Sequence, residues 1–240
     1  MTTSTTNNIN IIPPIALFIS LLCTFTSPLV FSETTKQTSK NWLSGWEAAG
    51  DDERISAECR QHKSKINQCK FVTTSDVSLE SLTAVIMDVN KFTEWAVSVS
   101  RSERIFQEEE PDKVYVYTNY DFVGAYDRDA VTLYTPEYDE SSNRVRITFQ
   151  TVDKDAPKED LRLVRFPLMA GYWQFTKLAN GKTEIELLSF TMPGGVVQKT
   201  LYYLYNKAYV DASFETIVAL EKQANKPRYG QFNIAALSLD

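Results

Sequence analysis

The spacing of apolar residues along the chain predicts a short amphipathic helix followed by a run of strands. From Leu79 to Val89 apolar residues recur at steps of three or four, and Ser78 stands before them as a good N-cap. A second short helix is predicted at 90–95. Alternation of apolar and polar residues marks strands at 114–119 and 144–149. Further strands are predicted at 55–60, 69–75, 97–107, 130–138, 163–168, 172–178 and 183–191. Turn-rich loops separate these runs, so we expect an antiparallel meander.

The C-terminal segment from about Val196 to Ala224 is predicted to form one long helix with two apolar faces. The first face is a stripe made by Val197, Leu201, Leu204, Ala208 and Ala212. The second face is made by Tyr203, Val210, Phe214 and Ile217. A helix that is apolar on two sides must be covered on both or must itself cover something. The small side chains of the stripe leave room for a cavity beneath the helix, although a conventional packed core would give the same periodicity.

The amino terminus has a different composition, because residues 1–32 contain no Lys, Arg, Asp or Glu. The apolar stretch at 15–25 and the compact residues at 30–32 predict an export signal peptide over residues 1–32. The stretch is too short to span a bilayer. The polar residues 33–40 are predicted to be a flexible leader, and residues 41–47, which contain Trp42 and Trp46, the start of a short helix.

Export changes the interpretation of the cysteines. Removal of residues 1–32 would take away Cys23 and leave Cys59 and Cys69, which flank a polar loop between two predicted strands. In an oxidising compartment this arrangement favours a structural disulfide. A redox pair would instead show Cys-x-x-Cys spacing. His62 lies in the same loop and is predicted to be exposed, so no catalytic triad can be built around it.

Composition excludes several classes of function. The chain has eight glycines, and none of them form the glycine-rich loops that cradle nucleotide phosphates. One histidine and three cysteines cannot supply a multi-ligand zinc site. The net charge of −6 gives nucleic acid no basic face to bind. We therefore expect no cofactor, no metal and no nucleic-acid partner, and a monomer.

The order of elements and several short motifs resemble START (steroidogenic acute regulatory protein-related lipid transfer) domains. The motifs are Arg128-Asp129 at the start of a strand, Arg165 followed by Gly171-Tyr172-Trp173, and Pro193-Gly194-Gly195 before the last helix. The resemblance covers about residues 41–226 and leaves 227–240 as a tail. It implies an α+β helix-grip fold, in which a curved antiparallel sheet wraps around a long C-terminal helix. It also implies a tunnel that holds one lipid or sterol, with the helix and a nearby loop as its gate.

The same resemblance suggests which residues would contact a ligand. Sterol-binding members carry a buried acid and a buried arginine, and ungapped counting places these at Tyr115 and Tyr134, which would make both anchors phenols. The expected polar contacts are Tyr115, Tyr117, Tyr134 and Arg165. The expected wall is Ile147, Phe149, Trp173, Leu187, Met192, Leu201, Leu204 and Ala208. Each wall residue could equally be part of a packed core.

The sequence therefore predicts a non-catalytic protein of the cell envelope that binds a lipid or other hydrophobic molecule and contacts membranes transiently. Its net negative charge disfavours electrostatic docking to anionic lipid. Two alternatives stay open. One is a cyclase or aromatase that uses the same cavity, with Asp127, Arg128, Asp129 or a buried tyrosine as acid or base. The other is a ligand-free periplasmic interaction module that docks through Trp42, Trp46 or the C-terminal tail.

Overall fold

The computed structural model describes residues 41–237, apart from 51, 106–112, 123–124 and 154–161. The predicted signal peptide at 1–32, the leader at 33–40 and the acidic loop tip at 108–112 lie outside the described residues.

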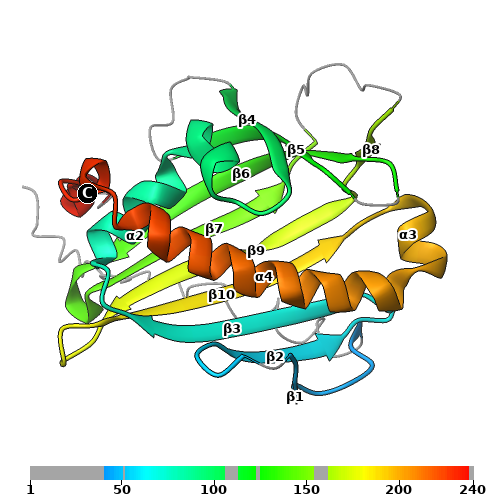
Figure 1. Cartoon of the computed structure of the whole chain (residues 1–240), viewed down its shortest axis with the longest axis horizontal. Coiled ribbons are helices and arrows are strands. Elements are labelled where there is room, and N and C mark those ends of the chain that lie inside the picture. Colours follow the sequence, from blue (N-terminus) through cyan, green and yellow to red (C-terminus); the bar gives the residue numbers. More distant parts are fainter. Residues whose placement is uncertain (1–40, 51, 106–112, 123–124, 154–161, 238–240) are drawn as a thin grey trace, which may run out of the picture. The chain divides into compact units, whose positions relative to one another are not determined.

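One large sheet forms the framework of the described chain (Figure 1). Its strands lie in the order β1-β2-β3-β10-β9-β7-β6-β5-β4, and each neighbouring pair is antiparallel. A short strand, β8, lies within the strand predicted at 163–168. It pairs with β6 in parallel, whereas the predicted meander was antiparallel. The strands are β1 (Glu47–Ala48), β2 (Ser56–Gln61), β3 (Asn67–Ser75), β4 (Val99–Ile105), β5 (Val114–Tyr120), β6 (Arg128–Asp139), β7 (Arg144–Thr151), β8 (Val164–Arg165), β9 (Leu168–Lys177) and β10 (Thr183–Met192).

The helices lie on one face of this sheet. They are α2 (Leu79–Met87), the 3-10 helix η2 (Val89–Glu94), α3 (Gly195–Thr200) and α4 (Tyr202–Ala224). In Figure 1, α4 runs across the sheet with α3 at one end and α2 at the other. The predicted helix-grip arrangement of a curved antiparallel sheet and a long C-terminal helix is confirmed. Within the described part of the chain, no helix combines the length and the apolar character that a membrane span requires.

Helix α2 forms where the sequence pattern predicts it. The Ser78 side chain accepts a hydrogen bond from the Ser81 backbone N–H, which satisfies a free donor at the helix N-terminus. Apolar side chains at the predicted positions, among them Leu82 and Val85, are fully buried. Helix α2 packs against α4 and so closes one end of the space between helix and sheet.

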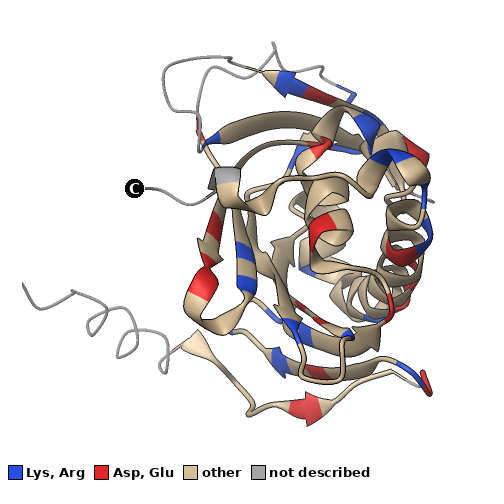
Figure 2. Ribbon diagram, turned by 90° about the vertical axis from the view of Figure 1, so that its left-hand side faces the viewer, with Lys and Arg blue, Asp and Glu red and all other residues tan. Residues whose placement is uncertain are grey.

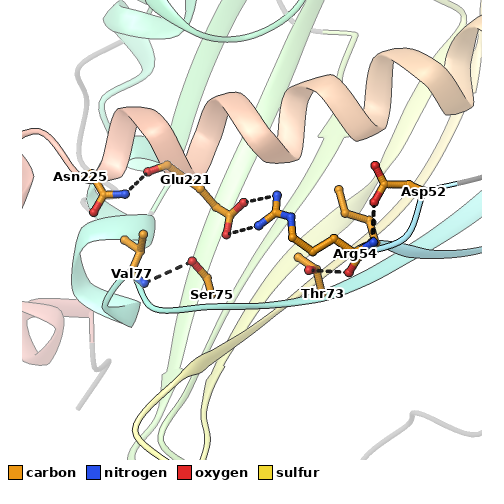
Figure 3. Close-up of polar contacts among 8 residues, drawn as sticks. Asp52, Arg54, Thr73, Ser75, Val77, Glu221 and Asn225 are labelled. Carbon is orange, nitrogen blue, oxygen red and sulfur yellow. Dashed lines mark hydrogen bonds and ion pairs between the residues drawn. The ribbon is translucent and has the colours of Figure 1, made fainter.

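The two halves of α4 are held differently. The buried residues of α4 begin only at Val210: Val210, Ser213, Ile217, Leu220, Gln223 and Ala224. In the first half, Tyr203 and Leu204 are 59% and 54% exposed. The second half is also tied to the sheet by Arg54, which donates hydrogen bonds of 3.1 and 2.7 Å to the Glu221 carboxylate (Figure 3). The helix is therefore anchored at its C-terminal end.

The chain beyond α4 adds to this anchor. Pro227–Tyr229 form a 3-10 turn, η4, and Tyr229 is buried in the core. The Tyr229 hydroxyl donates to Asp88, and Gln223 donates to the Tyr229 hydroxyl. Arg228 forms a 2.6 Å ion pair with Glu94. The start of the C-terminal tail thus closes the end of the domain that contains α2 and η2.

A disulfide joins Cys59 of β2 to Cys69 of β3. The two residues lie directly opposite one another, with their Cα atoms 4.1 Å apart, and both are buried. His62, predicted to be exposed in the following loop, is only partly exposed. Its ring contacts Trp42 and Phe190 and lies 2.8 Å from the Ser64 hydroxyl.

Two predicted helical segments are wrong in detail. Residues 41–47 are not a helix: Trp42 forms a β-bridge with His62, and the Leu43 N–H donates to the Gln61 carbonyl, because this segment lies along the sheet edge. The long C-terminal helix is interrupted at Leu201, whose φ of −111° separates α3 from α4.

Candidate ligand-binding site

A cavity of about 520 Å³ lies between the sheet and the segment formed by α3 and α4. This volume falls in the range of about 300–1,000 Å³ that is typical of small-molecule sites. From the sheet it is lined by Tyr120, Tyr134, Phe149, Met169, Trp173, Leu187, Ser189 and Thr191. From α3, α4 and the residue between them it is lined by Val197, Leu201, Leu204, Tyr205, Ala208, Tyr209, Ala212, Ser213 and Thr216.

The first apolar stripe predicted on the C-terminal helix faces this cavity. Every member of the stripe is in its lining: Val197, Leu201, Leu204, Ala208 and Ala212. The second predicted set supplies core contacts instead, since Ile217 is fully buried and Phe214 packs edge-on against Phe71 of β3. Because the stripe contains two alanines, the helix leaves space where larger residues would fill it.

Two loops complete the wall. The segment 95–99, which joins η2 to β4, contributes Trp95 to Val99, and the loop after β5 contributes Asp121, Phe122 and Ala125. The two loops are joined by a 2.8 Å hydrogen bond from the Asp121 N–H to the Ser98 carbonyl. Phe122 stacks on Tyr205 of α4, with 6.3 Å between ring centroids. The loop after β5 is thus in contact with the exposed half of α4.

Tyrosine hydroxyls supply much of the polarity of the cavity, and burial keeps the phenols in their neutral form. Burial raises the pKa of Tyr120 and of Tyr209 to about 12. Burial also raises the pKa of Tyr134 and of Tyr205 well above the usual value. Tyr120 and Tyr209 both raise the pKa of Tyr205 further, so these phenols lie close enough to influence one another. At neutral pH all of them are hydrogen-bonding groups without charge.

Most of these hydroxyls already have partners within the protein. The Tyr205 hydroxyl donates to the Thr191 carbonyl at 3.1 Å. The polar side chains of Ser189, Thr191 and Ser213 surround the Tyr209 hydroxyl and partly offset the rise in its pKa. The Tyr120 hydroxyl contacts the Met169 sulfur at 3.8 Å, a weak acceptor. Such partners explain how polar groups can be buried here at acceptable cost.

Arg128 lies beside the cavity but does not line it. Its guanidinium stacks on the Phe122 ring at 4.2 Å and donates to the carbonyls of Pro193 and Tyr126. The side chain is 2% exposed and joins the start of β6 to the segment that precedes α3. These contacts give Arg128 a structural role at the start of β6.

Several of the predicted contact residues do line the cavity. They are Tyr134, Phe149, Trp173, Leu187, Leu201, Leu204 and Ala208. The other predicted residues lie elsewhere: Tyr115, Tyr117, Ile147, Arg165 and Met192 are not in the cavity wall.

Tyr115 and Tyr117 lie outside the wall because of the alternation of side chains along β5, and Arg165 of β8 lies with Tyr117. Tyr120 faces the cavity, so Tyr115 and Tyr117, at odd-numbered positions of the same strand, point to the opposite face. There the Tyr117 hydroxyl donates to Asp129 at 3.1 Å, and Arg165 donates to Asp129 at 2.8 and 2.7 Å. The predicted polar anchor Arg165 therefore belongs to a polar cluster on the far face of the sheet.

Ile147 and Met192 miss the cavity for different reasons. Ile147 points to the same face as Phe149 but is fully buried in the core. It lies opposite Trp173 of the neighbouring strand β9. Met192 ends β10, and its neighbour Thr191 occupies the cavity-facing position. Ile147 is therefore a residue of the packed core.

The sequence interpretation missed some of the lining. Tyr205 and Tyr209 follow Leu201 at steps of four and could have been found by extending the helical stripe. Trp95, Phe122 and Phe166 come from connecting segments, where no periodicity exists to reveal which side chains turn inward.

The site offers little for metal or acid–base chemistry. Among the described residues, no group of three or more His, Cys, Asp or Glu side chains could hold a metal ion. Asp129 is paired with Arg165 outside the cavity, and Asp127 accepts a hydrogen bond from the Phe122 N–H.

A sheet that grips one long helix over an apolar cavity defines the helix-grip class, and the described chain has this START-like fold. Three solved structures are similar to it. A STAR-related lipid transfer protein from Xanthomonas axonopodis (fragment 25–204) has a TM-score of 0.67 and 22% identity, covering 76% of this chain and 100% of its own. Human StAR-related lipid transfer protein 5 has a TM-score of 0.65 and 15% identity, covering 81% and 92%. Zhui aromatase/cyclase from Streptomyces sp. R1128 has a TM-score of 0.50 and 15% identity, covering 67% and 94%. No protein-family profile and no curated protein sequence matches the chain.

Proposed function

We propose that this protein binds one lipid or other hydrophobic molecule in the cavity beneath α4, without covalent chemistry, and stores or transfers it in the cell envelope. The observation that carries the proposal is the cavity of about 520 Å³, which the apolar stripe of the C-terminal helix leaves open above an aromatic wall. Burying an acyl chain in such a space contributes about 0.8 kcal/mol per methylene group before the costs of binding. Likeness of fold to proteins named for lipid transfer supports the same function.

The surroundings of the cavity support entry near the first half of α4. Leu201 and Leu204 line the cavity yet are 37% and 54% exposed, so this part of the wall is accessible to solvent. Exposed apolar side chains lie in the same region, namely Tyr126, Val196 and Tyr203. An exposed apolar group beside an opening is suited to transient contact with a membrane from which a lipid could enter.

A location in the cell envelope is supported by two features. The disulfide between Cys59 and Cys69 fits an oxidising compartment, and residues 1–32 have the pattern of a signal peptide. We propose that the exported protein is periplasmic and monomeric, with residues 41–226 as the lipid-binding domain.

We propose binding in preference to catalysis because the cavity wall has few groups suited to acid–base work. The lining contributed by the described residues contains no His, Cys, Lys, Arg or Glu, and Asp121 is its one carboxylate. The buried tyrosines have raised pKa values, which makes them poor proton donors or acceptors near neutral pH.

Native mass spectrometry of protein purified from the cell envelope tests the proposal. We expect a bound molecule of a few hundred daltons that organic extraction removes and that lipid extract restores. Protein that carries no such mass and takes up none from the extract would contradict the proposed function.

A further inference from the structure

Building on the proposed function, we infer that the cavity selects an uncharged ligand whose single hydroxyl or carbonyl group pairs with the Tyr134 hydroxyl. The inference concerns the class of ligand, and it excludes ionised fatty acids and phospholipids. It follows from the charges around the cavity and from a tyrosine hydroxyl in the described lining, that of Tyr134, to which the described residues offer no hydrogen-bond partner.

Charge is the first part of the argument. Of the described residues that line the cavity, only Asp121 is ionisable near neutral pH, and it is an exposed residue of the loop after β5. Lys, Arg, Asp and Glu are instead mixed over the strands and helices without separation by sign (Figure 2). An ionised head-group inside the cavity would lose its water and find no counter-charge in this wall, which disfavours binding strongly.

Arg128 lies beside the cavity and could in principle pair with an anionic ligand, but it already has partners within the protein. Its guanidinium is bonded to the carbonyls of Pro193 and Tyr126 and covered by the Phe122 ring. Freeing it for a ligand would take the hydrogen bond from the carbonyl of Pro193, a buried residue. Arg165 is no substitute, because its guanidinium is bonded to Asp129 on the opposite face of the sheet.

The hydroxyl groups are the second part of the argument. The Tyr205 hydroxyl donates to the Thr191 carbonyl, and Tyr120 contacts the Met169 sulfur. Polar side chains of Ser189, Thr191 and Ser213 surround the Tyr209 hydroxyl. Tyr134 lines the cavity and is 7% exposed, yet its hydroxyl has no hydrogen-bond partner among the described residues. Among the buried polar atoms without a partner are Trp95 Nε1 and Thr132 Oγ1, but both atoms are closed to solvent. The Tyr134 hydroxyl is therefore the group that a ligand could satisfy.

The position of Tyr134 is fixed by packing, so that its hydroxyl can serve as a defined contact. Its ring packs against Phe92 at 5.9 Å and Phe149 at 6.0 Å between centroids. A phenol can donate to or accept from a neutral polar group, whichever the ligand offers. An unpaired buried hydroxyl costs free energy, so a ligand that pairs with it gains affinity.

The test compares probes of the same chain length on protein produced from the full sequence and freed of bound lipid. Tritiated oleyl alcohol, oleate, oleylamine and the hydrocarbon 1-octadecene are measured for binding at pH 7.4. We expect oleyl alcohol to bind at least about ten-fold more tightly than oleate or oleylamine. If either charged probe binds as tightly as oleyl alcohol, the inference is wrong although the proposed function stands. If no probe binds, the proposed function itself fails.

A pair of variants then tests the assigned contact. Tyr134→Phe keeps the ring and removes the hydroxyl, so oleyl alcohol should bind about three- to ten-fold more weakly while 1-octadecene is unaffected. Tyr117→Phe is the matched control, because its hydroxyl donates to Asp129 outside the cavity, and the variant should bind both probes as the unmodified protein does. Equal affinities of oleyl alcohol for Tyr134→Phe and the unmodified protein would overturn the contact.

Discussion

Phe149 and Gly171 lie opposite one another on β7 and β9, and the Phe149 ring covers the glycine. A Cβ atom built on Gly171 would stand 2.8 Å from Phe149 Cζ and would overlap the Leu188 carbonyl oxygen. Phe149 is part of the cavity wall, so the missing side chain of Gly171 helps to set the position of that wall. Glycine in a strand often marks such a close approach.

The first prediction follows from this contact. Gly171→Ala should lower the free energy of unfolding by about 1–3 kcal/mol, because the added methyl group overpacks a closed site. Urea denaturation measures the change. Gly45→Ala is the control, since a Cβ at Gly45 meets nothing within 4 Å and its effect should stay within about 0.5 kcal/mol. Equal stabilities of the two variants would show that the strands adjust freely.

A second prediction concerns the cavity. Ala208→Trp places a large ring in the space that the stripe leaves open, so uptake of lipid should fall strongly while the free energy of unfolding changes by less than about 1 kcal/mol. Lys207→Trp, on an exposed neighbouring position outside the lining, is the control and should bind lipid normally. If Ala208→Trp takes up lipid at the normal level, the cavity beneath α4 is not the binding site.

The Arg54–Glu221 pair should contribute measurably to the anchoring of α4. The carboxylate receives two hydrogen bonds and is 12% exposed, while the arginine side chain is 51% exposed, so we expect a coupling energy of about 1 kcal/mol. A double-mutant cycle with Arg54→Met and Glu221→Gln, followed by urea denaturation, measures it. A coupling energy indistinguishable from zero would assign the anchor to apolar packing alone.

Acid should weaken the contact between η2 and the C-terminal turn. Hydrogen bonds from Arg228 and Gln223 lower the pKa of Glu94 to about 2. Since this is below the value of about 4.3 for a free glutamate, the stabilisation is complete above about pH 4.3 and is lost as the pH falls through about 2. The Tm of Glu94→Gln should therefore lie below that of the unmodified protein at pH 7 and approach it near pH 2.

Glu215→Gln, on an exposed position of α4, controls for the loss of one negative charge. A Tm difference for Glu94→Gln that stays constant between pH 7 and pH 2 would contradict this account of the cluster.

Thiol titration tests both the disulfide and the predicted processing. Unfolded, unreduced protein isolated after export should contain no free thiol, because Cys59 and Cys69 are paired and Cys23 would leave with residues 1–32. A single free thiol would show that the N-terminal segment is retained. Cys59→Ala combined with Cys69→Ala should cost about 2–4 kcal/mol of stability.

The sequence predicted the helical side of the cavity wall better than it predicted the polar contacts. The stripe on α4 could be recognised because a helix repeats its faces with a period that is visible over many residues. On β5 the same reasoning could not choose a face: Val116 and Tyr117 are both buried, so alternation alone did not show which side faced the cavity. The tertiary contacts show which face is which. Tyr117 contacts Asp129, the partner of Arg165, outside the cavity, whereas Tyr120 contacts Met169 in the cavity wall.

The failed helix at 41–47 has a similar cause. Trp42 and Trp46 gave the segment an apolar character that suggested burial of a helical face. In the structure the Arg60 guanidinium contacts both rings, with 3.9 Å from its Cζ to the Trp42 centroid and 4.6 Å to the Trp46 centroid. These contacts depend on β2, which follows in the chain, so a local pattern could not anticipate them.

The bond between Cys59 and Cys69 has a consequence for the hairpin as a whole. Because it joins residues that face one another, β2 cannot slide along β3 by even one residue without breaking a covalent bond. A slip of one residue would turn every inward side chain of the strand outward. The cross-link thus makes misaligned pairing of this edge hairpin chemically inaccessible once the bond has formed.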